Sequence, residues 1–145
     1  MRVAVLPGDG VGPEVVAEAR KVVDATGVAI EWSELPWGSA WWQEHGEMMP
    51  PDPIETLRVH DAILMGAVGD PAVSDPVTLW GLILKLRQEL DLYANVRPVR
   101  LLEGIPCPLA RQGPEVCREG PRTRDVCGDA TTAEVGDAVA ARVAS

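Results

Sequence analysis

The chain has 145 residues, of which 46% are hydrophobic and 24% charged, the composition of an ordinary globular domain. Its 22 Asp and Glu residues outnumber its 13 Lys and Arg residues, and the net charge of −9 disfavours a nucleic-acid-binding or membrane-binding surface. No apolar run reaches the roughly 18 residues of a membrane span, and the start lacks the long apolar segment of a secretion signal. We expect a cytoplasmic protein that binds neither nucleic acid nor membranes.

Large apolar side chains are missing from the last part of the chain. Every Trp, Leu and Ile and the only Tyr lie at or before Leu109. Apart from prolines, the apolar residues of 111–145 are only Val, Ala and Cys. Such a segment buries too little apolar area to offset the entropy lost on ordering it. We expect a globular part over residues 1–110 and a low-order tail over residues 111–145.

Strand and helix patterns alternate through the globular part. Short, apolar, often β-branched runs predict buried strands at residues 2–6, 28–32 and 61–65. Helical spacing of apolar residues and the helix stop signals predict helices at residues 13–27, 37–46, 54–59 and 78–90, and residues 93–102 are predicted to be extended. Because strands alternate with helices, the predicted fold class is α/β with a mainly parallel sheet.

A glycine-rich turn, Gly8-Asp9-Gly10-Val11-Gly12-Pro13, follows the first strand. Its position before a helix suggests a Rossmann dinucleotide site, and Glu31 stands about where a ribose-binding acid would. The spacing disagrees, because Pro13 replaces the third glycine and Asp9 brings a negative charge to a loop that would receive pyrophosphate. We favour the alternative, a tight strand-to-helix turn whose glycines adopt positive φ.

Two arginines suggest a site for a small carboxylate ligand. Arg87 lies near the end of a predicted helix, and Arg97 lies on the extended segment that follows. Two converging guanidiniums can each form a bidentate pair with a carboxylate. The alternative is an ordinary ion pair with Glu89, Asp91 or Glu103, and the charge pattern alone favours that alternative.

Five motifs occur in one order at coherent spacing: GDGVGPEV (8–15), HGEMMP (45–50), GAVGDP (66–71), TLWG (78–81) and LRQELDLYANVRPVRLL (86–102). With these motifs, residues 1–110 resemble the metal-dependent β-decarboxylating dehydrogenases of the isocitrate/isopropylmalate dehydrogenase family, and most of all its tartrate/D-malate branch. The resemblance implies an isopropylmalate-dehydrogenase-like fold, here a partial first domain, and not a Rossmann fold.

The resemblance also implies an activity: oxidation of a 2-hydroxy dicarboxylate at C2, followed by loss of its β-carboxylate. The cofactors it implies are NAD and Mg²⁺ or Mn²⁺. Members of the family are homodimers. Arg87 and Arg97 match the arginines that clamp the leaving carboxylate. Ile83 matches the position that meets the C3 substituent, where an apolar residue offers the third carboxylate of isocitrate no partner. The alternative for Ile83 is an ordinary core residue. The residues that match the loop beside the cofactor are Gly69, Asp70 and Pro71.

Later parts of the family pattern have no match in this sequence. The relatives' V-R-E-N-x-E-G-x-Y motif is only echoed at residues 116–120, and no Tyr or Lys follows. We therefore assign no catalytic and no metal residue, since Asp125, Asp129 and Asp137 lack a supporting scaffold. We expect a catalytically incomplete chain from a truncated or frameshifted gene, with residues 111–145 out of frame. The alternative is a non-catalytic remnant that binds a dicarboxylate or a partner protein.

Overall fold

A computed structural model describes residues 1–98, 121 and 128–144. The chain divides into two compact units, one formed by residues 1–16 and 29–95 and the other by residues 17–28 and 96–145. Helix α1 (Gly12–Ala25) contributes residues to both. In the part of the chain that is described, no helix is long and apolar enough to cross a bilayer, and a cytoplasmic location stays a prediction.

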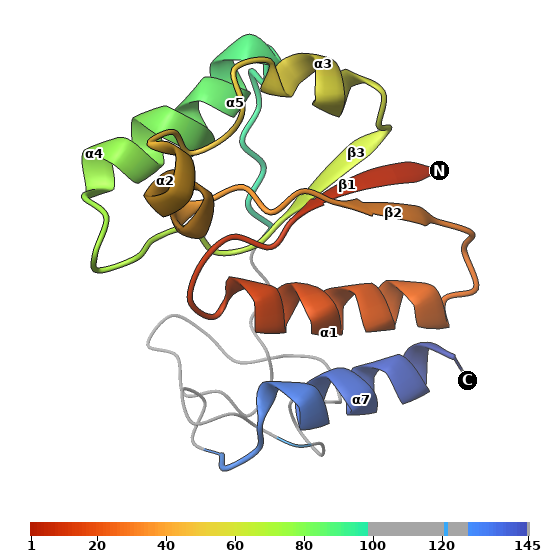
Figure 1. Cartoon of the computed structure of the whole chain (residues 1–145). Helices are drawn as coiled ribbons and strands as arrows, with labels where there is room; N and C mark the ends of the chain where they lie inside the picture. Colours follow the sequence, from red (N-terminus) through yellow and green to blue (C-terminus); the bar gives the residue numbers. More distant parts are fainter. Residues whose placement is uncertain (99–120, 122–127, 145) are drawn as a thin grey trace. The chain divides into compact units, whose positions relative to one another are not determined.

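The first unit is built on a parallel sheet of three strands, β1 (Arg2–Leu6), β2 (Glu31–Glu34) and β3 (Ala62–Met65), in the order β2-β1-β3 (Figure 1). The prediction of an α/β fold with a parallel sheet is confirmed. The second strand begins at Glu31, later than the predicted residue 28. Its pairing starts opposite Arg2, where β1 itself begins, and residue 28 still belongs to the turn after α1, because its N–H donates to Thr26 Oγ1.

Three helical segments cover one face of this sheet: α2 (Ser39–His45), α3 (Pro53–Arg58) and the run that starts with α4 (Asp75–Thr78) (Figure 1). Helices α2 and α3 confirm the short helices predicted at 37–46 and 54–59. Alternate residues of a strand share a face, and Ala4 and Leu6 of β1 belong to the buried cluster under these helices. The other buried members of that cluster are Trp37, Met48, Met49, Leu57, Leu82 and Leu86.

The helix predicted over 78–90 is a longer, irregular run. It comprises α4, a π-helical turn η1 (Leu79–Ile83) and α5 (Leu84–Glu89). The run starts earlier than predicted because Ser74 caps it through its carbonyl oxygen, which accepts from the N–H groups of Val77 and Thr78. It ends where Asp91 adopts a left-handed conformation with φ of 53° and the N–H of Leu92 turns back to the carbonyl of Arg87 at 2.9 Å.

The second unit contains a helix that the sequence analysis did not predict, α7 (Thr132–Val143). It starts with a capping box, in which Thr131 Oγ1 accepts from the N–H of Glu134 at 3.3 Å and Glu134 Oε2 accepts from the N–H of Thr131 at 2.7 Å. The pattern Thr131-x-x-Glu134 was visible in the sequence. Residues 111–120, 122–127 and 145 of the predicted tail, which include Asp125 and the 116–120 segment, lie outside the described residues, as does Glu103.

Candidate functional site

The glycine-rich turn after β1 packs against the loop after β3. Gly8 and Gly10 have φ values of 76° and 55°, which confirms the strand-to-helix turn with positive φ. A Cβ on Gly8 would overlap the carbonyl oxygen of Ala67. The N–H of Asp9 donates to that same oxygen at 2.7 Å. The glycines therefore let two backbone segments meet at the carboxyl end of the sheet, which is where open α/β sheets bind ligands.

The loop Gly69-Asp70-Pro71, predicted to contact NAD, follows β3 at this edge. Gly69 has a φ of 151°, and no heavy atom lies within 4 Å of the position that a Cβ would take. Asp70 closes a local turn, because its Oδ1 accepts from the N–H of Ala72 at 2.7 Å and its carbonyl accepts from Val73. The loop thus offers an uncovered backbone that a flat ring system could approach. Its contact with a cofactor stays a prediction.

Ile83 and Arg87 line one small cavity between β3 and the α5 segment. The cavity measures about 190 Å³, and its other walls are apolar: Ile63, Met65, Leu86, Leu90 and Leu92. Ile83 is half-buried, whereas its neighbour Leu82 is completely buried in the core. Neighbouring residues of the helical run therefore face different surroundings: Leu82 faces the core and Ile83 faces the cavity. The π-turn that ends at Ile83 belongs to a type of distortion that is frequent at functional sites.

The Arg87 guanidinium is exposed and makes no hydrogen bond or ion pair with any residue that the structure describes. The alternative pairs with Glu89 and Asp91 are therefore not formed, and Glu103 lies outside the described residues. Arg97 is also exposed and unpaired among the described residues. It belongs to the second unit, so the structure describes the two arginines separately and their convergence stays a prediction.

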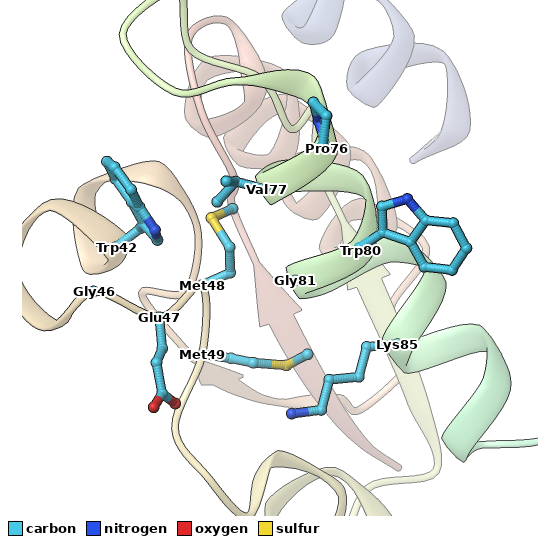
Figure 2. Close-up of a pocket in the computed structure, with 10 residues that line it drawn as sticks. All are labelled: Trp42, Gly46, Glu47, Met48, Met49, Pro76, Val77, Trp80, Gly81 and Lys85. Atoms are coloured by element: carbon cyan, nitrogen blue, oxygen red, sulfur yellow. The ribbon is translucent and has the colours of Figure 1, made fainter.

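A larger cavity, which sequence reasoning missed, lies between the HGEMMP loop and the TLWG helix. It measures about 570 Å³ (Figure 2). Met48 and Met49 are buried beneath it, and Glu47 and Lys85 line it from opposite sides without an ion pair to any described residue. A Cβ on Gly81 would lie 2.8 Å from Met48 Cγ. The glycine of TLWG therefore admits a methionine of HGEMMP, and the two motifs form one packing unit. No predicted site residue lines this cavity.

The described residues by themselves form no complete metal site. Across residues 1–98 and 128–144, no three His, Cys, Asp or Glu side chains come together as a candidate metal site. Asp137, one of the three tail carboxylates considered, instead pairs with Lys21 at 2.6 Å. We therefore assign no metal-dependent step to these residues.

Open α/β sheets bind ligands at the carboxyl ends of their strands, where this sheet carries its glycine loop, and apolar cavities with a few polar groups, such as the one that Arg87 lines, are typical ligand sites. Residues 2–118 match the family model described as isocitrate/isopropylmalate dehydrogenase. The chain belongs to this family.

Three curated relatives illustrate the similarity. The D-malate dehydrogenase [decarboxylating] of Escherichia coli is 48% identical in an alignment of 120 residues that covers 79% of this chain and 33% of that protein. The 3-isopropylmalate dehydrogenase of Frankia casuarinae is 51% identical over 76% of this chain and 32% of its own length. The tartrate dehydrogenase/decarboxylase of Pseudomonas putida is 46% identical over 77% of this chain and 32% of its own length. The chain thus spans about a third of the length of these relatives, and identity alone does not separate their substrates.

Solved structures give the same family. The isocitrate dehydrogenase of Methylococcus capsulatus is similar with a TM-score of 0.62 and 34% identity, over 72% of this chain and 30% of that one. A β-decarboxylating dehydrogenase of Thermococcus kodakarensis is similar with a TM-score of 0.54 and 39% identity, over 63% of this chain and 27% of that one. The prediction of an isopropylmalate-dehydrogenase-like fold is confirmed.

Proposed function

We propose that this chain carries part of the substrate and cofactor sites for NAD-dependent oxidative decarboxylation of a 2-hydroxy dicarboxylate related to D-malate or tartrate. The D-malate and tartrate enzymes among the relatives support the reaction class. The observation that carries the proposal is the cavity shared by Ile83 and Arg87. An unpaired guanidinium beside an apolar wall suits a ligand that has a carboxylate next to a short carbon chain.

Arg87 and Arg97 would together clamp the carboxylate that leaves and keep the scissile bond aligned. Ile83 would meet the C3 substituent, where an apolar side chain leaves a third carboxylate without a partner. Gly69, Asp70 and Pro71 would hold NAD, which when bound accepts the hydride from C2. The resemblance implies Mg²⁺ or Mn²⁺, and the described residues would have to share the binding of such an ion with further ligands, because no three of their His, Cys, Asp or Glu side chains come together.

We further propose that these 145 residues by themselves do not complete the reaction. No Lys follows Lys85 and no Tyr follows Tyr93 in the sequence, so the proton-transfer groups that the resemblance implies have no match. The second candidate function is therefore a non-catalytic one, in which the chain binds a dicarboxylate or a partner protein. The unpaired Arg87 supports retained dicarboxylate binding.

Calorimetric titration of the whole chain with D-malate tests the site. We expect Arg87→Gln to weaken binding by about 10-fold to 100-fold, since a hydrogen-bonded charge pair contributes about 1.5–3 kcal/mol. Lys85→Gln is the matched control, because it removes a positive charge two positions away, from the wall of the other cavity. It should change the dissociation constant by less than about twofold, within the range of weak surface charge effects.

Equal weakening by Arg87→Gln and Lys85→Gln would mean that only net charge matters and would refute the site.

A second experiment tests whether the chain is catalytically incomplete. With D-malate, NAD and Mg²⁺ or Mn²⁺ present, we expect the chain alone to form no NADH, measured by absorbance at 340 nm. Metal-dependent NADH formation would refute that part of the proposal. Mixing with an intact relative and measuring the mass of the complex tests the partner-binding alternative.

A further inference from the structure

The Asp9 carboxylate is buried and joins three segments of the first unit. Asp9 is 9% exposed and Ser39 is 1% exposed. Asp9 Oδ1 accepts from the N–H of Ser39 at 2.8 Å, and Oδ2 accepts from Ser39 Oγ at 2.7 Å and from the N–H of Gly69 at 3.0 Å. One side chain on the turn after β1 thus holds both the start of α2 and the loop after β3.

Gly38 makes room for this side chain. A Cβ on Gly38 would lie 2.9 Å from Asp9 Oδ1, a separation that real Cβ contacts do not reach. The three donors are neutral, and no ion pair to Asp9 is found among the described residues. The negative charge is therefore stabilised by oriented N–H and O–H dipoles. This arrangement requires the donors to stay in place, because a buried carboxylate that loses them is strongly disfavoured.

The middle of the loop after β3 is hydrogen-bonded to Asp9. Gly66 is held by the carbonyl of Leu6 at 2.8 Å, and the far end is held by the local turn at Asp70. Between them, the described hydrogen bonds of residues 67–69 all go to Asp9: its N–H binds the carbonyl of Ala67 and its carboxylate binds the N–H of Gly69. Gly69 has a φ of 151° and no side chain, and no heavy atom lies within 4 Å of the position that a Cβ would take, so no side-chain packing fixes its conformation.

We infer that Asp9 is a positioning residue, which sets the conformation of the Gly69-Asp70-Pro71 loop and thereby the affinity of the chain for NAD without touching NAD itself. The inference rests on the proposed function for the contact between this loop and NAD. In this role the Asp9 carboxylate does not face an incoming pyrophosphate. It points into the protein and accepts a hydrogen bond from the backbone of the neighbouring loop.

The test compares Asp9→Asn, Ser39→Ala and the control Asp52→Asn in the whole chain. Asp52 is exposed and its side chain makes no capping hydrogen bond. In Asp9→Asn an amide N–H₂ replaces one acceptor and faces a donor. We expect the Gly69 amide to exchange at least about tenfold faster with solvent, as measured by NMR, and the dissociation constant for NAD to rise at least about tenfold. The dissociation constant for D-malate should stay within twofold, since Ile83 and Arg87 lie outside this hydrogen-bond set.

Ser39→Ala removes one of the three bonds and keeps the backbone donor, so it tests the inference even if Asp9→Asn does not fold. It should weaken NAD binding about twofold to fivefold and leave D-malate binding unchanged. An unchanged Gly69 exchange rate in both variants would overturn the inference, as would equal weakening of NAD and D-malate binding. Failure of the wild-type chain to bind NAD would instead refute the cofactor assignment of the proposed function, and the Gly69 exchange rate would then decide whether Asp9 positions the loop.

Discussion

The ammonium of Lys21 on α1 lies 2.6 Å from Asp137 Oδ1 on α7, although the two residues are 116 positions apart in the sequence. The same ammonium lies 2.6 Å from Glu18 Oε2, one turn earlier on α1. Gly136 adds to the contact, because a Cβ there would overlap the Glu18 side chain. Within the second unit, a glycine of α7 therefore meets a charged cluster on α1.

The first prediction concerns this cluster at high pH. The carboxylates of Asp137 and Glu18 raise the pKa of Lys21 above its ordinary value of 10.5. A raised lysine pKa contributes stability that is fully present below 10.5 and is lost as the pH rises through the higher, folded-state value. We expect the α1–α7 contact to weaken only as the pH rises above 10.5. Nuclear Overhauser effects between the two helices, measured by NMR as a function of pH, would show this.

Lys21→Met should weaken the same contact at neutral pH, and Lys85→Met is the control, since Lys85 has no ion pair among the described residues. An α1–α7 contact that survives Lys21→Met unchanged would contradict the role of the cluster.

The second prediction concerns the start of α7. Hydrogen bonds from the Thr131 backbone and side chain lower the pKa of Glu134 below its ordinary value of 4.5. The cap therefore contributes stability above pH 4.5, which is lost as the pH falls through the lowered value. We expect Thr131→Ala to reduce α7 helicity at neutral pH, measured by carbon chemical shifts. Thr132→Ala, one residue inside the helix, should leave it unchanged. Equal effects of the two substitutions would argue against the capping box.

The third prediction separates backbone strain from lack of space in the turn after β1. Gly8 and Gly10 both have positive φ, but a Cβ on Gly10 meets nothing within 4 Å whereas one on Gly8 overlaps the Ala67 carbonyl. Gly10→Ala should cost about 1–2 kcal/mol of unfolding free energy from strain alone. Gly8→Ala should cost about 2–5 kcal/mol, because overpacking adds to the strain. Urea unfolding measures both, and equal losses would show that the close approach to Ala67 does not matter.

The fourth prediction uses the neighbours Leu82 and Ile83. Leu82→Ala should lower the free energy of unfolding by about 2–5 kcal/mol, because it opens a cavity in the core, and should leave ligand binding unchanged. Ile83→Ala should weaken binding of 3-isopropylmalate about 10-fold to 200-fold, as loss of an apolar contact does. D-malate, which has no C3 substituent, should bind Ile83→Ala as it binds the wild type. If Ile83→Ala weakened the binding of both ligands equally, Ile83 would not be the residue that contacts the C3 substituent.

Local patterns predicted most of the first unit. The apolar runs that form β1 and β3 and the helical spacing of α1 need only neighbours in the chain to be recognised, and the motifs identified the family. The second strand was misplaced at its start because the β-branched run at residue 28 has strand propensity, whereas pairing opposite Arg2 decides where a strand begins. Helix α7 was missed because its apolar side chains are small, although its capping box is a local signal.

By itself the sequence determined the alternation of strands and helices, the turn that needs glycines, and the residues whose types suit a dicarboxylate. Only the tertiary structure decided which of those residues share a cavity, as Ile83 and Arg87 do, and what the charge of Asp9 serves. A carboxylate in a glycine turn can repel an anion or accept backbone N–H bonds. The choice depends on donors 30 and 60 residues away, at Ser39 and Gly69. Those donors come within reach only when parallel strands bring their carboxyl ends to one edge of the sheet.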